Sequence, residues 1–117
     1  MLDFGSQYAQ LIARRVREKR VYSVLARPDV TAAELRELNL KGLIFTGGPN
    51  SVYDPGAPHC RPELLDLGVP ILGICYGMQI ACQMLGAEIQ SVPAREYGPA
   101  TLTVTDADAL LHNLPAE

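Results

Sequence analysis

Two short apolar runs, each followed by a glycine-containing turn, constrain the fold of this chain more than any other feature. The runs are residues 42–46 and residues 69–74. Neither shows the apolar–polar alternation of a half-exposed strand, so each predicts a strand buried in a parallel sheet. The first run opens into Gly47 and Gly48, and the second turns into helical sequence at Tyr76. Strand and helix are therefore expected to alternate along the chain.

The remaining segments extend this alternation. Thr31 followed by Glu34 has the pattern of a capping box, and Gly86 stands where a helix is expected to end. Helices are predicted at residues 7–19, 31–38, 63–67 and 76–85, strands at 21–26, 42–46 and 69–74, and short extended pieces at 88–92, at Tyr97 and at 102–104. This order predicts an α/β fold with a mostly parallel central sheet and helices on both faces, in one domain spanning residues 1–117.

Charge and cysteine content exclude several classes of function. A formal net charge of −3 gives no reason to expect nucleic acid or an acidic membrane as a partner, and no apolar run is long enough to cross a bilayer. Three cysteines without a closely spaced pair favour neither a disulfide framework nor a zinc site, which fits a reducing cytoplasm. A basic cluster is interpreted as the solvated side of the first helix, with a docking face for another domain as the alternative: Arg14, Arg15, Arg17, Lys19 and Arg20.

The turn at Cys75 has the form of a nucleophile elbow. Gly73 and Gly77 flank the cysteine at the spacing of the G-x-S-x-G pattern, with sulfur in place of oxygen. A position at the start of a helix favours a thiolate, because unpaired N–H groups point toward it. The alternative is a small buried apolar residue, the usual role of a free cysteine and the one expected for Cys82.

The glycine pair after the first strand is a candidate oxyanion-binding loop. Loops that leave the carboxyl ends of adjacent parallel strands line one crevice, so this loop is expected to face Cys75. The N–H groups of Gly48 and Tyr76 would then stabilise a tetrahedral intermediate. We expect Gly48→Val to impair catalysis while leaving the fold intact. The alternatives are an ordinary glycine turn or a pyrophosphate loop, although the aspartate of such a loop is missing.

Three further polar residues differ in how well they suit the same site. Gln79 lies one helical turn after Cys75, where its carboxamide would contact a polar substrate or face solvent. His59 lies in a proline-rich loop and His112 near the end of the chain, and both are interpreted as surface residues.

Residues 73–79 resemble the elbow of the class I glutamine amidotransferases. Tyrosine at position 76 is typical of the GMP synthase family among them, and the resemblance covers essentially the whole chain. The other matching segments are residues 2–8, 10–18, 47–53 and 95–98. The resemblance implies a flavodoxin-like fold, with catalytic roles for Cys75, Gly48 and Tyr76 and glutamine binding by Gly47, Gln79, Tyr97 and Gly98.

The resemblance also implies a reaction and its partners. Glutamine would be hydrolysed through a Cys75 thioester, and the ammonia would aminate XMP to GMP. That second step belongs to a separate synthetase (ATP pyrophosphatase) domain, which uses ATP and magnesium, while no cofactor is expected in this chain. The full protein is expected to be a cytoplasmic homodimer.

The chain departs from the family pattern at both ends. The family's first strand extends further before Asp3, and its His-x-Glu pair would follow Glu117. We therefore expect a fragment that is inactive by itself. Two alternatives remain open: an amidotransferase of anthranilate, CTP or carbamoyl phosphate synthesis, and a non-catalytic glutamine-binding module without the triad histidine.

Overall fold

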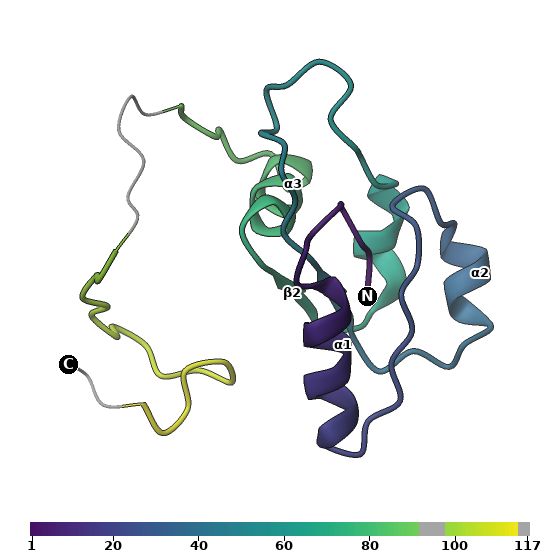
Figure 1. The fold of residues 1–117 in the computed structure, drawn as a ribbon, viewed down its shortest axis with the longest axis horizontal. Coiled ribbons are helices and arrows are strands. Elements are labelled where there is room, and N and C mark those ends of the chain that lie inside the picture. Colours follow the sequence, from purple (N-terminus) through teal and green to yellow (C-terminus); the bar gives the residue numbers. More distant parts are fainter. Residues whose placement is uncertain (92–97, 115–117) are drawn as a thin grey trace.

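A parallel sheet forms the centre of the computed structural model, which describes residues 1–91 and 98–114 (Figure 1). Strand β1 (Leu43–Phe45) pairs in parallel with β2 (Ile71–Gly73), with Phe45 opposite Gly73. Leu2 forms parallel bridges to Phe45 and to Ala26. The spatial order is therefore Ala26, Leu2, β1 and β2, which confirms the predicted parallel arrangement of the α/β fold.

Helices form at the predicted places along the chain. Helix α3 (Tyr76–Met84) packs against β1 and β2, and the short α2 (Ala32–Arg36) contacts the 3₁₀ helix η1 (Pro62–Leu67). Helix α1 (Ala9–Glu18) begins two residues later than predicted, and α2 ends two residues earlier. Boundaries of this kind depend on fraying and local turns, so differences of one or two residues are usual.

The capping box at Thr31 and the helix end near Gly86 are both present in the structure. The Glu34 N–H donates to the Thr31 hydroxyl at 3.2 Å, and the Thr31 N–H donates to the Glu34 carboxylate at 2.8 Å. Helix α3 ends at Met84, and Gly86, two residues later, has a φ of +87°. The Ala87 N–H then donates to the Cys82 carbonyl at 2.9 Å, which is the backbone bond of a Schellman cap.

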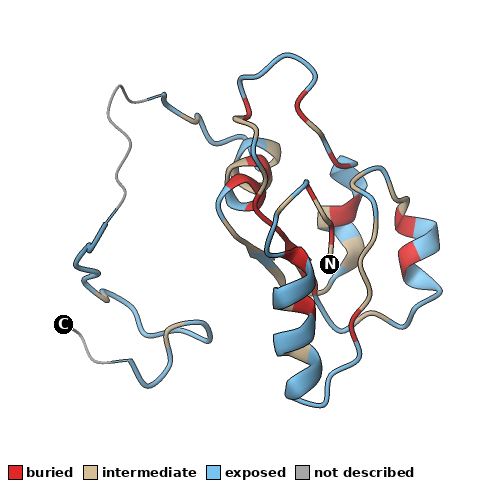
Figure 2. Cartoon of the chain, in the orientation of Figure 1, coloured by how far each residue is buried: buried red, intermediate tan, exposed pale blue. Residues whose placement is uncertain are grey.

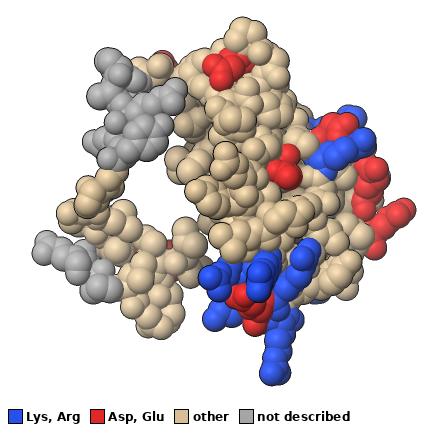
Figure 3. Space-filling model, in the orientation of Figure 1, with Lys and Arg blue, Asp and Glu red and all other residues tan. Residues whose placement is uncertain are grey.

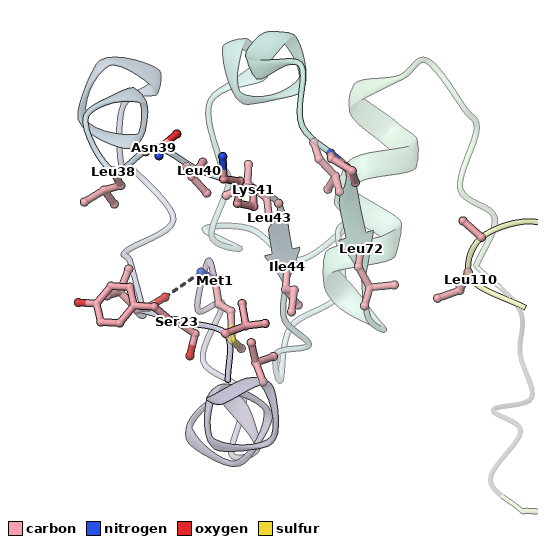
Figure 4. A pocket seen from close by; sticks show the side chains of 18 of the residues that line it. Met1, Ser23, Leu38, Asn39, Leu40, Lys41, Leu43, Ile44, Leu72 and Leu110 are labelled. Carbon is pink, nitrogen blue, oxygen red and sulfur yellow. Dashed lines mark hydrogen bonds between the residues drawn. The ribbon is translucent and has the colours of Figure 1, made fainter. Parts of the chain in front are cut away.

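The two faces of the sheet are covered unequally. Leu2, Leu43 and Phe45 are 0–2% exposed and form the core beneath α3 (Figure 2). On the opposite face Ile44 and Leu72 border an apolar hollow of about 910 Å³, which Val16 of α1 also lines (Figure 4). Helix α1 therefore covers only part of that face.

The extended segments were predicted less well than the helices. Residues 21–26 form a single bridge at Ala26 rather than a strand, because their pairing partner is only the short Met1–Asp3 segment. Residues 88–91 and 102–104 are not strands, and Leu102 is 62% exposed. An extended segment becomes a strand only when a neighbouring strand satisfies its backbone groups. Val92 and Tyr97 lie outside the described residues.

The basic cluster lies on the solvated side of α1, as predicted (Figure 3). Arg14 and Arg15 form exposed ion pairs with Glu18, and such pairs contribute little stability. The Arg17 guanidinium instead donates to the Ser23 carbonyl at 2.8 Å and holds the following segment against the helix. Among the described helices, none is long and apolar enough to span a membrane.

Candidate functional site

The candidate site lies at the carboxyl edge of the sheet, where β1 and β2 both end. Because the strands are parallel and in register, the loop after Phe45 and the turn after Gly73 leave side by side. A Cβ built on Gly47 would lie 3.4 Å from the Cβ of Cys75 and 3.8 Å from the Ile74 carbonyl oxygen. The glycine loop therefore faces the cysteine, as the sequence predicted.

Cys75 occupies a strained turn between β2 and α3. Its φ of +50° and ψ of −115° lie in a region that residues with a side chain rarely adopt. The residue is exposed while its neighbour Tyr76 is buried. This combination of a strained backbone and an accessible side chain is typical of a nucleophile elbow.

The two elbow glycines are sterically required. A Cβ on Gly73 would lie 2.5 Å from the Cα of Met78, in the first turn of α3. A Cβ on Gly77 would collide with the carbonyl groups of Phe45 and Thr46 at the end of β1. Close contact between the helix and both strands therefore allows only glycine at these positions, as expected from the motif.

Tyr76 anchors the elbow through its side chain. Its hydroxyl donates to the Pro58 carbonyl at 2.5 Å, and its ring lies 5.4 Å from the ring of Phe4. Burial raises the pKa of the Tyr76 phenol above its usual value. As the first residue of α3, Tyr76 also has a backbone N–H without a partner inside the helix, as an oxyanion donor requires.

Gly48 is packed against the N-terminal segment. A Cβ at this position would collide with the Phe4 carbonyl oxygen and lie 3.2 Å from its carbon. The expectation that Gly48→Val would leave the fold intact is therefore wrong, because the extra atoms must displace backbone. Among the described residues, no hydrogen bond uses the Gly48 N–H, so this donor is free to meet a ligand.

One residue at this edge was not singled out from the sequence. Thr46, the residue between β1 and Gly47, is 0% exposed. Its hydroxyl accepts a hydrogen bond from the Phe4 N–H at 3.1 Å and donates to the Gly47 carbonyl at 3.0 Å. The available signal was a hydroxyl residue directly between a buried strand and a glycine pair.

The predicted substrate-binding residues are only partly assembled. Gln79 lies in the first turn of α3, half-buried, and its N–H donates to the Cys75 carbonyl at 3.1 Å. Gly98 is exposed, and within residues 1–91 and 98–114 no atom outside its adjoining residues lies within 4 Å of its Cβ position. Tyr97 lies outside the described residues. A glutamine-binding role for these residues therefore stays a prediction.

The other cysteines and the histidines differ clearly from Cys75. Cys60 is buried with its sulfur 3.4 Å from the Met84 sulfur, and burial raises its pKa to about 11. His59 and His112 are exposed, and among the described residues no hydrogen bond joins either imidazole to the free thiol of Cys75. No group of three metal-binding side chains occurs within residues 1–91 and 98–114.

Comparison with known proteins agrees with this geometry. The family model described as "Glutamine amidotransferase class-I" matches residues 1–117, the whole chain. The chain is 56% identical over 117 residues to GMP synthase (glutamine-hydrolyzing) of Bacillus cereus and 54% identical to a putative GMP synthase (glutamine-hydrolyzing) of Halalkalibacterium halodurans. It covers 23% of the length of each, and 21% of the GMP synthase of Synechocystis sp., to which it is 54% identical.

A strained, exposed cysteine between two crowded glycines thus faces a glycine loop at the carboxyl edge of a parallel sheet. The family model described as "Glutamine amidotransferase class-I" matches the entire chain. The chain belongs to the class I glutamine amidotransferase family.

Proposed function

We propose that this chain is the glutaminase part of a GMP synthase. The observation that supports this most directly is the strained, exposed Cys75 lying against the Gly47–Gly48 loop. The identity of 54–56% to GMP synthases, over the whole or nearly the whole chain, favours this pathway over anthranilate, CTP or carbamoyl phosphate synthesis.

In the proposed reaction the Cys75 thiolate attacks the side-chain carboxamide carbon of glutamine. The N–H groups of Gly48 and Tyr76 stabilise the oxyanion of the tetrahedral intermediate. Its collapse breaks the carbon–nitrogen bond, and the leaving amine takes up a proton and departs as ammonia. Water then hydrolyses the thioester, which releases glutamate and restores the thiol.

Other residues complete this proposal. Gln79, Gly47, Tyr97 and Gly98 would bind the glutamine substrate. A base outside residues 1–117 would deprotonate the thiol, because neither His59 nor His112 hydrogen-bonds Cys75. The ammonia would be consumed by a synthetase domain of the same protein, which uses ATP and magnesium to aminate XMP. The assembled enzyme would be a cytoplasmic homodimer.

The test uses the complete protein that carries this chain. Cys75→Ala should abolish glutamate release and glutamine-dependent GMP formation, while added ammonium salts should still support GMP formation. Cys82→Ala is the matched control, because Cys82 is a half-buried thiol further along α3, and it should keep both activities.

Two results would contradict the proposal. Undiminished glutamate release by Cys75→Ala would remove the nucleophile role. Glutamate release accompanied by amination of an acceptor other than XMP would place the chain in another pathway.

Residues 1–117 expressed alone should bind glutamine weakly and release no glutamate.

A further inference from the structure

Thr46 is the most completely buried polar side chain near the candidate site. Only two described polar residues are buried, Ser23 at 9% exposure and Thr46 at 0%. The Thr46 hydroxyl uses its oxygen to accept from the Phe4 N–H and its proton to donate to the Gly47 carbonyl. A buried hydroxyl with two defined partners has one orientation, so it holds both partners in place.

The bond to Gly47 has a consequence for the next residue. The Gly47 carbonyl and the Gly48 N–H belong to one peptide unit, which is trans and planar. In such a unit the C=O and the N–H point in opposite directions. A hydrogen bond that fixes the Gly47 oxygen therefore also fixes the direction of the Gly48 N–H.

Apart from the contact of Gly48 with the Phe4 carbonyl, the side chains around this peptide restrain it little. Glycine on both sides gives the backbone a wide choice of φ and ψ, so rotation of the peptide meets no side chain of its own. The Thr46 hydroxyl is the one described side-chain donor to the Gly47 carbonyl. Loss of that hydroxyl would remove this restraint on the direction of the Gly48 N–H.

Phe4 connects Thr46 with Tyr76, the other candidate oxyanion donor. The Phe4 backbone donates to Thr46, and the Phe4 ring packs on Tyr76 at 5.4 Å and on Phe45 at 5.9 Å. The Thr46 N–H donates to the Leu2 carbonyl at 3.1 Å, which ties this residue into the sheet. Phe4 therefore contacts both Tyr76 and Thr46, the residue that hydrogen-bonds the peptide carrying the Gly48 N–H.

We propose that Thr46 is a positioning residue that orients the Gly48 N–H as an oxyanion donor. Its side chain is fully buried, and it acts through the Gly47–Gly48 peptide rather than on the substrate. This inference rests on the proposed glutaminase function. Because the oxyanion forms only during the reaction, loss of the hydroxyl should lower kcat with little change in KM.

The experiment compares Thr46→Val with Thr46→Ser in the complete protein. Valine has nearly the same shape as threonine but no hydroxyl, whereas serine keeps the hydroxyl and loses only the methyl group. Thr46→Val should lower kcat for glutamate release by about tenfold to a hundredfold, with KM for glutamine within about twofold. The kcat of Thr46→Ser should stay within about threefold of the wild-type kcat.

A matched control separates positioning from general loss of stability. The Ser23 hydroxyl donates to the Ala13 carbonyl at 3.0 Å, beside α1 and without contact to the glycine loop. Ser23→Ala should lower Tm while leaving kcat near the wild-type value. If Thr46→Val does not fold, Thr46→Cys, which keeps a weaker donor, should show an intermediate loss of kcat.

The outcomes distinguish this inference from the function on which it rests. Wild-type kcat in folded Thr46→Val, or a rise in KM alone, would overturn the role of Thr46 and leave the glutaminase function intact. A loss of kcat in Thr46→Ser equal to that in Thr46→Val would also overturn it, since the hydroxyl is then not the cause. Wild-type protein that releases no glutamate would overturn both proposals.

Discussion

At the scale of single residues, backbone strain and accessibility distinguish Cys75 from the other two cysteines. Its φ of +50° costs free energy of about 1–3 kcal/mol in a residue that carries a Cβ. The crowded contacts of Gly73 and Gly77 hold the turn in this conformation despite the cost. The same turn leaves the Cys75 side chain exposed, whereas Cys60 is buried and Cys82 half-buried.

The first prediction concerns the order of thiol modification. A glutamine-like electrophile added below one equivalent should label Cys75 before Cys60 or Cys82. Cys60 should be the slowest, because it is buried and its pKa of about 11 leaves almost no thiolate at neutral pH. Mass spectrometry of the modified peptides measures the order, and equal labelling of the three cysteines would contradict it.

The second prediction concerns the dependence of stability on alkaline pH. The pKa of Cys60 is raised from 9.0 to about 11 in the folded chain, so the unfolded chain loses this proton first. Its contribution to stability is complete below pH 9 and is lost as the pH rises through 11. Urea unfolding of wild type and Cys60→Ala should show a steeper alkaline decline in the wild type. Parallel curves for the two proteins would show that burial of this thiol contributes nothing.

At the scale of elements, each helix depends on signals within a few residues of its ends. The five-residue α2 is too short to be stable by itself, so its capping box is a large part of what defines it. Hydrogen bonds from the Thr31 hydroxyl and N–H lower the pKa of Glu34 below its usual value. This contribution is present above pH 4.5 and is lost as the pH falls through the lowered pKa.

The third prediction tests this cap. Thr31→Ala should lower the free energy of unfolding by about 1 kcal/mol at neutral pH, because the Glu34 N–H loses its acceptor. Thr31→Ser keeps the hydroxyl and should cost much less. The difference between the two variants should shrink at low pH, where protonated Glu34 no longer completes the capping box. Denaturant titrations at neutral and acidic pH measure both effects.

At the scale of the whole molecule, the two faces of the sheet have different roles. The face beneath α3 carries the core, with Leu43 at 2% and Phe45 at 0% exposure. The opposite face borders the 910 Å³ hollow, where Leu72 is 36% exposed (Figure 4). Residues on the two faces therefore contribute unequally to the stability of this chain.

The fourth prediction compares these faces with one kind of substitution. Leu43→Ala should lower the free energy of unfolding by about 2–5 kcal/mol, because it opens a cavity in the packed core. Leu72→Ala should cost at most about 1 kcal/mol, because the side chain already contacts solvent. Equal losses for the two variants in the isolated chain would show that the hollow is closed in solution.

The sequence by itself determined the features that depend on neighbours in the chain. The two parallel strands, the elbow at Cys75, the capping box at Thr31 and the helix end at Gly86 were all predicted, because steric and hydrogen-bonding requirements there act over a few residues. The predicted burial of the second strand was wrong, because β2 has only partial cover and Leu72 is 36% exposed. The resemblance of residues 73–79 to one enzyme family made the nucleophile assignment specific. These features define the fold class and the position of the candidate site.

Only the tertiary structure decided which distant segments meet. Residues 21–26 and 102–104 carry strand-like sequence, yet the first forms one bridge and the second none, because a strand requires a partner along its length. The contact of Gly48 with Phe4 and the hydrogen bond from the Phe4 N–H to the Thr46 hydroxyl join residues more than forty positions apart. Sequence patterns over a few residues cannot predict such contacts, because these contacts depend on the order of the strands in the sheet.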